Sequence, residues 1–263
     1  DSSTSRGLGD VYKRQGYKAG GYNTQMFSDV LQQKVMETMG LSAKYDVSTI
    51  ISYAPEKSWN YEIGCRLSTA DRKLSGEMAL FYIDCRDQQL TMFPEGTTTG
   101  RIMANAGKTR SVGAEISGRW RPASQWMIRA SYGFTSAEFV DFDNGREDYA
   151  GRRVPYVPQN TFFAGVSWNR PLSRSLSIEI NVGLRGVGSI YWDEANRYRQ
   201  PFYALLDASA AVSGRRWSVT LGGDNLTATR YATFSYESIG NRFVQRGKPA
   251  RGTVTFRYEI STF

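Results

Sequence analysis

Apolar and polar side chains alternate one by one along most of the chain from Trp59 onward. The clearest run is 175–185, in which leucine, isoleucine and valine fill the even positions while serine, glutamate, asparagine and arginine predominate at the odd ones. A period of two is that of a β-strand with one apolar and one polar face. About ten such segments follow one another, so the pattern predicts an all-β, antiparallel chain.

The connections between these segments alternate in length. Short turns are expected near residues 70, 122, 172 and 214. Longer loops are expected at 24–56, 141–157, 193–201 and 226–248, with a shorter one near 94–99. Outer-membrane barrels join their strands by short periplasmic turns on one side and longer extracellular loops on the other. The pattern therefore favours an antiparallel transmembrane β-barrel over the alternative, a soluble β-sandwich, whose loop lengths would not alternate in this way.

Composition agrees with a barrel and removes several other classes. The 263 residues have a mean hydropathy of -0.46 and include no apolar run long enough for a membrane-spanning helix. Barrel strands need only every second residue to be apolar, so a low mean hydropathy is compatible with a membrane protein. The net charge of +8 comes from lysines and arginines that are spread without a basic block. We therefore expect no nucleic-acid partner.

The chain has no histidine and two cysteines. Without histidine it lacks the commonest general base and metal ligand, so we expect no enzyme activity, no metal site and no cofactor. A hairpin centred between Ala70 and Asp71 would place Cys65 opposite Gly76. Cys85 would then lie roughly 30 Å away along the strand, at about 3.3 Å per residue, which is too far for a disulfide.

All six tryptophans fall at the ends of predicted strands and share the parity of the apolar face. They are Trp59, Trp120, Trp126, Trp168, Trp192 and Trp217. Indole rings at the ends of lipid-facing rows form the aromatic girdles of membrane barrels. The core anchors of a sandwich would not be restricted to strand ends. We also expect Trp120 and Trp126 to face each other across a hairpin centred near Ala123.

Residues 1–15 are expected to be a foreign segment. Asp10–Gln15 is what a transposon end used in sequencing libraries gives when translated in frame, and 1–9 show no strand or helix pattern. We exclude 1–15 from the fold prediction and assign 16–263 to the barrel. The protein is then expected to continue upstream.

Residues 217–263 combine two alternating segments with a polar stretch between them. The last segment places Val254, Phe256, Tyr258 and Ile260 on one face, and the motifs before it are Asn225-Leu226, Arg230-Tyr231 and Gly247-Lys-Pro-Ala-Arg251. This ending resembles the C-terminus of TonB-dependent outer-membrane receptors, although Phe263 is out of phase with the apolar face. Similar short segments recur at 16–23, 55–62 and 153–158, so the resemblance covers nearly all of 16–263.

This resemblance implies a barrel of about 22 strands that encloses a plug, of which this chain supplies about the last ten. We expect those strands to form a curved sheet whose first and last members do not pair. The family also implies a bacterial outer-membrane location, contact with lipid, recognition of the C-terminal strand by the barrel-assembly machinery, and the TonB complex as partner through the missing N-terminal part. It implies active uptake of a scarce ligand, most often a ferric siderophore. A passive porin or an adhesin is the alternative.

Charged side chains on the polar strand faces are expected to line the lumen, where they either pair with one another or contact a ligand. They are Glu62, Arg66, Glu77, Glu115, Arg119, Arg129, Glu179, Arg185, Arg257 and Glu259. Ligand contacts are expected from the long loops, at Arg152, Arg153, Arg197, Tyr198 and Arg199. Guanidinium groups beside a phenol suit an anionic, catechol-like or carboxylate ligand. The alternative is that these loops are only solvated.

Overall fold

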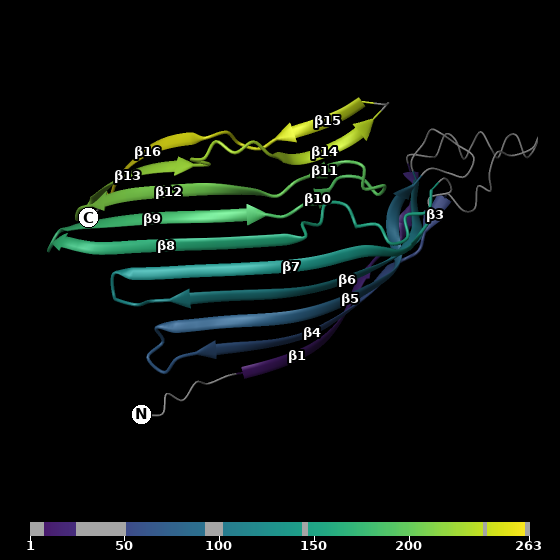
Figure 1. Cartoon of the computed structure of the whole chain (residues 1–263), viewed down its shortest axis with the longest axis horizontal. Helices are drawn as coiled ribbons and strands as arrows, with labels where there is room; N and C mark the ends of the chain where they lie inside the picture. The colour runs from purple at the N-terminus through teal and green to yellow at the C-terminus, as the bar shows by residue number, and fades with distance from the viewer. Residues whose placement is uncertain (1–7, 25–50, 93–101, 144–146, 239–240, 261–263) are drawn as a thin grey trace, which may run out of the picture.

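Ten long antiparallel strands form one sheet in the computed structural model, which describes residues 8–24, 51–92, 102–143, 147–238 and 241–260. Neighbours in the sheet follow one another along the chain (Figure 1). The strands, in order across the sheet, are β1 (Leu8–Lys18), β4 (Glu56–Ser68), β5 (Leu74–Met92), β6 (Ile102–Trp120), β7 (Trp126–Phe142), β8 (Asn160–Ser173), β9 (Leu176–Val187), β12 (Tyr203–Ser213), β13 (Trp217–Asp224) and β16 (Arg251–Tyr258). No helix among these residues is long and apolar enough to cross a membrane.

Six short strands pair two by two at the end of the sheet opposite the short turns (Figure 1). They are β2 (Gly21–Tyr22) with β3 (Ser52–Tyr53), β10 (Ile190–Tyr191) with β11 (Arg199–Gln200), and β14 (Ala232–Ser238) with β15 (Asn241–Arg246). The predicted loop at 226–248 therefore contains a β-hairpin. Most of the predicted loops at 24–56 and 94–99 lies outside the described residues.

The register gives the sheet one apolar face. Directly opposed residues share a face, and Ile180, Ala210, Leu221 and Val254 form one such row across four strands. Leu221 is 56% exposed and Val254 is 74% exposed. Rows of exposed aliphatic side chains are costly in water and stable against lipid, so this face fits the outer wall of a membrane barrel.

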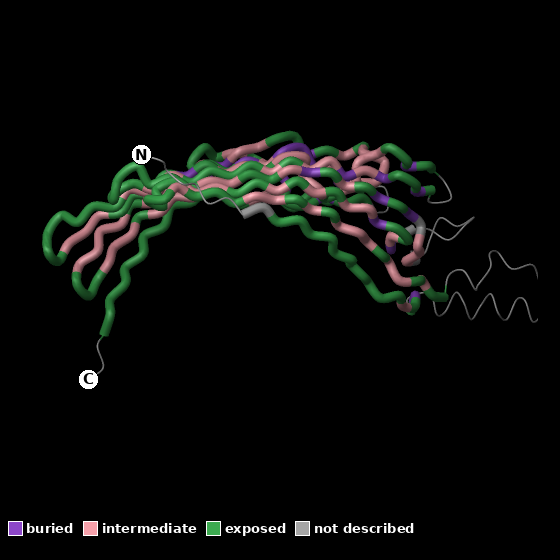
Figure 2. The backbone as a smooth tube through the Cα atoms, turned by 90° about the horizontal axis from the view of Figure 1, so that it is seen from below, coloured by how far each residue is buried: buried purple, intermediate pink, exposed green. Residues whose placement is uncertain are grey.

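The opposite, polar face lines an open trough of about 570 Å³ that extends from Asp10 on β1 to Thr161 on β8. Seen from the side, the sheet is an arch (Figure 2). Because a trough that spans six neighbouring strands of an arched sheet lies on its concave side, the polar face is the concave one. The predicted lumen-facing and lipid-facing sets are thus on opposite sides of the sheet.

The sheet curves without closing, as predicted. β1 and β16 stand at its two ends, and each pairs with one neighbour among the described strands. An unpaired strand edge in lipid leaves backbone N–H and C=O groups without partners, at a cost of several kcal/mol each. The ten strands are therefore part of a larger barrel.

Two predicted hairpin registers are wrong by two residues. Trp120 lies opposite Ile128, not opposite Trp126, because the hairpin is centred on Ser124 rather than Ala123. Trp126 instead lies opposite Trp168 on the next strand, with ring centroids 6.3 Å apart. A shift of two keeps every side chain on its face, so the assignment of faces is unaffected.

The second shifted hairpin is the one that carries the cysteines. Cys65 lies opposite Met78, and Cys85 lies opposite Ser58. Both thiols are free, as predicted. The seven positions between Met78 and Cys85 correspond to about 23 Å of extended strand, far beyond the reach of a disulfide.

The first strand begins earlier than predicted. Leu8–Lys18 pairs with β4 over its whole length, so part of the excluded segment 1–15 adopts strand structure. Backbone hydrogen bonds form this ladder and require no alternation of side chains, which is why the sequence pattern missed it. On β1 the apolar face carries Lys13, whose amino group lies 4.6 Å from the ring centroid of Trp59.

Candidate functional site

The two cation-bearing loops predicted to bind ligand are held together by hydrogen bonds. The backbone N–H of Arg153 donates to Oδ1 of Asn196 at 2.8 Å, and Nδ2 of Asn196 donates back to the carbonyl of Arg153 at 2.9 Å. The Arg152 guanidinium donates to the carbonyl of Ala195 at 2.6 Å. Segments 149–154 and 193–197 therefore behave as one unit, and sequence reasoning missed Asn196, the residue that joins them.

Asp193 organises the 193–201 loop from its first turn. Its carboxylate accepts hydrogen bonds from the backbone N–H groups of Arg197 at 3.2 Å and Tyr198 at 2.8 Å, and from Nε of Arg197 at 3.3 Å. An aspartate that accepts from the backbone a few residues on is a common way to close a tight turn. The hydrogen bond from the Arg197 side chain to the Asp193 carboxylate raises the pKa of the guanidinium above its usual value, so this side chain is always charged.

Tyr198 connects this loop to the β14–β15 hairpin. Its hydroxyl donates to Glu237 at 2.8 Å, and the Arg242 guanidinium lies 4.7 Å above its ring. The hydrogen bond to Glu237 raises the pKa of the Tyr198 phenol, which keeps it protonated and able to donate. Arg199, the last predicted contact, donates to Ser189 Oγ at 2.5 Å. All five predicted residues thus lie in one group of connected segments, 149–157, 188–201 and the β14–β15 hairpin, which we call the loop assembly. Each of the five already has a hydrogen-bond partner within it.

Five aromatic rings from three segments form a continuous run that we call the aromatic ladder: Tyr156, Trp192, Phe234, Tyr236 and Phe243. Tyr156 stacks on Phe234 at 5.7 Å, and Tyr236 stacks on Phe243 at 5.1 Å. Phe234 and Tyr236 are 5.6 Å apart, which joins the two stacks. Phe243 is 48% exposed and Tyr156 is 49% exposed, so the ladder offers ring surface to a ligand. Phe234 and Tyr236 occupy alternate positions of β14, and this alternation was the available signal for a strand. The strand was not predicted because the segment is short and lies inside a polar stretch.

Trp192 does not lie on the lipid-facing surface, where the predicted girdle placed it. It is only 5% exposed and packs with Ile190 and Ala232, because the loops that follow β9 and β13 close over it. Of the other five, Trp120, Trp126 and Trp217 are exposed, and Trp168 and Trp59 are half-buried. Contact of these five with lipid stays a prediction.

The lumen-facing charges pair only in part. Arg66 forms an ion pair with Glu77 at 3.2 Å, and Arg185 forms one with Asp207 at 3.3 Å. Glu77 also accepts from Ser117 at 3.1 Å. Exposed pairs of this kind contribute little to stability, so they fix side-chain positions more than they hold the sheet.

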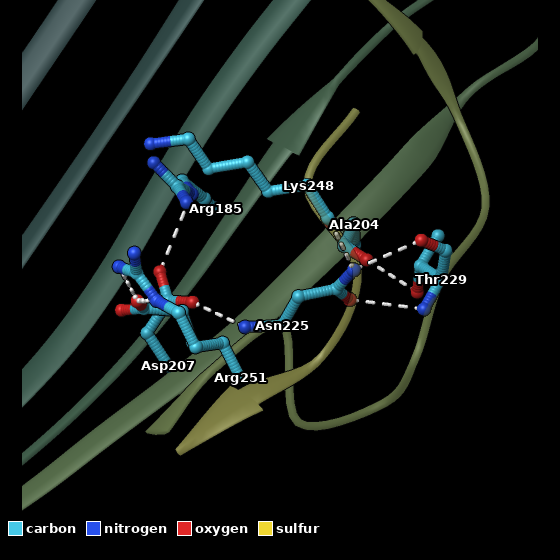
Figure 3. A network of polar contacts seen from close by, with 8 residues as sticks. Arg185, Ala204, Asp207, Asn225, Thr229, Lys248 and Arg251 are labelled. Carbon is cyan, nitrogen blue, oxygen red and sulfur yellow. Dashed lines mark hydrogen bonds and ion pairs between the residues drawn. The ribbon is translucent and has the colours of Figure 1, made fainter. Parts of the chain in front are cut away.

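A second polar centre lies where β13 leaves the sheet (Figure 3). Asn225 is 2% exposed and has a positive φ of 49°. Its Nδ2 donates to the carbonyls of Thr229 and Lys248 at 3.0 Å each, and its Oδ1 accepts from the Thr229 N–H at 2.9 Å. Its own N–H donates to Asp207 at 2.8 Å. Asn225 therefore joins both ends of the 226–250 segment to the sheet.

The neighbouring motif residues complete this junction. Tyr231 stacks on Tyr203 with centroids 4.4 Å apart, and Gly247 lies against the Tyr231 ring where no Cβ would fit. Arg251 forms an ion pair with Asp224 at the start of the last strand. The Asn-Leu, Arg-Tyr and Gly-x-Pro-x-Arg motifs are thus parts of one structural clamp between β13 and β16.

The Asn196→Ala substitution is expected to separate the two loops without unfolding the sheet. It removes both hydrogen bonds to the Arg153 backbone, each worth about 1 kcal/mol. Limited proteolysis of the full-length protein should then cut within 141–157 or 193–201 several times faster. Ser175→Ala, in a short turn at the other end, is the matched control and should leave both rates unchanged. Equal rates in the two variants would contradict the role given to Asn196.

The comparison with protein families decides the identity of this architecture. The sequence model of the TonB-dependent receptor-like β-barrel matches residues 14–226. The chain belongs to this family. Membership places its strands in the bacterial outer membrane, as the apolar outer face indicates.

Individual relatives agree with this membership. The pesticin receptor of Yersinia enterocolitica is 36% identical over 230 residues, which are 86% of this chain and 30% of that protein. The ferrichrome outer membrane transporter/phage receptor of Escherichia coli K12 is 26% identical over 78% of this chain and 27% of that protein. The crystal structure of the ferric yersiniabactin uptake receptor of Yersinia pestis superposes with a TM-score of 0.75 at 27% identity, over 98% of this chain and 37% of that one. The chain thus spans about a third of the length of its relatives.

Proposed function

We propose that this chain is part of an outer-membrane receptor that takes up a ferric siderophore, with energy supplied by the TonB system. The observation that carries the proposal is the superposition on the ferric yersiniabactin uptake receptor over 98% of the chain. The 36% identity to the pesticin receptor supports it further. Lipid and the barrel-assembly machinery, acting on the closing strand, are the other partners we propose. We propose no catalytic role, no resident cofactor and no nucleic-acid partner.

The chemistry of the loop assembly supports an anionic, ring-bearing ligand. The Arg197 side chain is 64% exposed beside its partner Asp193, so a ligand carboxylate or phenolate can approach the guanidinium directly. The aromatic ladder adds stacking surface for planar groups on the same loops. These loops lie at the end of the sheet opposite the short turns, which in an outer-membrane barrel is the extracellular side.

The test replaces the exposed cations in the full-length receptor. We expect Arg197→Ala/Arg199→Ala to weaken binding of the recognised ferric siderophore at least about tenfold, the effect of one lost charge-assisted hydrogen bond. Ferric yersiniabactin and ferrichrome are the first probes. Binding is measured by titration, and uptake is measured with radiolabelled iron in cells that lack other siderophore receptors.

The matched control is Arg215→Ala/Arg216→Ala, which removes the same two charges from a short turn at the opposite end. It should leave affinity and uptake unchanged. If both double variants bind equally well, the 193–201 loop has only a structural role. Uptake that persists in cells without TonB would point instead to a passive porin, and binding without uptake would point to an adhesin.

We also propose that residues 1–15 are foreign to the receptor. Lys13 lies on the outer face beside the rings of Trp59 and Tyr61, and a charged side chain departs from the apolar pattern of a lipid-facing row. The proposal is tested by sequencing the source locus directly. A continuous reading frame that encodes Asp10–Gln15 in the genome would refute it.

A further inference from the structure

Two arginines lie directly opposite each other on the concave face, near the short turns. Arg119 on β6 and Arg129 on β7 are partners in the sheet register. Both are exposed, and neither forms an ion pair with a carboxylate among the residues that the structure describes. The Arg129 guanidinium lies 5.8 Å from the centroid of the Phe163 ring. Like charges directly opposite on neighbouring strands are destabilising unless an anion lies between them.

The nearest carboxylates on this face are already in use. Glu77 is held by Arg66 and Ser117, and Glu179 accepts from Asn181 at 2.8 Å. Lys73, nearby, pairs with Asp71 in the short turn. Among the described residues, therefore, neither glutamate forms an ion pair with Arg119 or Arg129.

Space for a partner lies around the two guanidinium groups. They line an open trough of about 430 Å³ together with the Arg66–Glu77 ion pair, Phe163 and small residues that include Ser75, Ser117 and Ser131. Small hydroxyl side chains allow an extended backbone to come close and offer it hydrogen bonds. The trough is thus suited to a peptide segment with carboxylates, in shape as well as in charge.

The place of this face in the whole protein identifies the partner. Both edges of the sheet are open, so further strands continue it into a closed barrel with the concave face inside. The matched part is only 30% of the length of the pesticin receptor, which leaves most of such a protein outside these strands. A segment of the same polypeptide enclosed by the barrel is therefore the nearest source of carboxylates.

We propose that Arg119 and Arg129 form a docking site for a carboxylate-bearing segment of the full-length receptor, one that lies outside residues 16–263 and inside the barrel. An aspartate or glutamate of that segment bridges the two guanidinium groups and relieves their repulsion. The proposal rests on family membership and on the open sheet, not on the ligand that the receptor carries.

Zero-length cross-linking of the full-length receptor tests this directly. Arg119→Lys and Arg129→Lys each place an amine at the site, and a carbodiimide then joins that amine to any carboxylate in contact as an amide. Peptide mass spectrometry is expected to find the new lysine joined to an aspartate or glutamate outside 16–263. The control is Arg66→Lys, which should join to Glu77, its partner at 3.2 Å.

Three results would overturn the proposal, provided that the control cross-link forms. They are cross-links only to carboxylates of this sheet such as Glu77, Glu115 or Glu179, a cross-link to a second copy seen as a band of doubled mass, and no cross-link at all. A second measurement uses Arg119→Gln/Arg129→Gln. Proteolysis of the enclosed segment should become about tenfold faster, the factor that one charge-assisted hydrogen bond supplies, whereas an unchanged rate would also count against the docking site.

Discussion

The Asn225→Ala variant of the full-length receptor is expected to lose about 3–5 kcal/mol of stability, a large effect for a single residue. Three hydrogen bonds of the buried Asn225 side chain disappear, and the Thr229 N–H and the carbonyls of Thr229 and Lys248 each lose a partner in a partly buried junction. Each of these hydrogen bonds contributes about 0.5–1.5 kcal/mol. Alanine must also adopt the positive φ of 49°, which costs about 1 kcal/mol or more.

Asn225→Gly separates these two causes. Glycine accepts a positive φ freely, so this variant should regain the stability that alanine loses to backbone strain. It should still lack the stability that the three hydrogen bonds contribute. Thr227→Ala is the matched control two residues along, where an exposed hydroxyl contacts only Thr229 Oγ1 at 2.9 Å. On gels of unboiled samples, the folded barrel migrates faster than the unfolded chain. The temperature at which the fast band disappears ranks the stability of the variants. We expect Thr227→Ala to be nearly normal, Asn225→Gly lower and Asn225→Ala lowest. If Asn225→Ala matched Thr227→Ala, the junction would not be held by this side chain.

Side-chain parity is what the sequence of such a chain determines best. A strand of Val, Leu and Ile at every second position can bury only one face in lipid, so the two faces were predictable. The open sheet was predicted from the apparently foreign N-terminus and the resemblance of the C-terminus to that of a larger barrel. The position of each hairpin along its neighbour was not. Cys65 and Trp120 both ended two residues from the expected partner, because a turn of two more residues leaves every side chain on the same face.

In the loops, the sequence identified candidate residues but not the contacts that they make. Their cations could be picked out as residues, but nothing in the sequence shows that Asn196 binds the Arg153 backbone across 43 positions. The same holds for Trp192, whose parity matched the outer face although loop packing buries it. Parity constrains a side chain only while its strand belongs to the sheet, and it fails once β9 ends and the chain folds back. The strand at Leu8–Gln15 was missed for a related reason, since backbone pairing is independent of side-chain pattern.

Two neighbouring residues of β8 provide a decisive test of the faces, with the second large effect that we expect. Val166 lies opposite Ile128 and Val182 on the apolar face, whereas Ser167 lies opposite Asn181 on the polar face. Both stand near the middle of a strand that runs from Asn160 to Ser173. In full-length receptor, Val166→Arg should lose stability in the membrane, by up to about 2–4 kcal/mol at the bilayer midplane and by less toward the girdle at Trp168, because a guanidinium on the lipid side cannot be hydrated.

Ser167→Arg makes the same change one position along the chain, and its guanidinium should point into the wet lumen at little cost. Folding into lipid vesicles from urea, followed by the gel shift of unboiled samples, measures both variants. We expect the folded fraction of Val166→Arg to collapse at a urea concentration where Ser167→Arg still folds like the unmodified receptor. Equal losses would mean that the two faces meet the same environment, as in a soluble sandwich, and a loss confined to Ser167→Arg would reverse the faces. Only a difference in the expected direction is compatible with lipid on the face that carries Val166, because the two variants introduce the same side chain at adjacent positions on opposite faces of one strand.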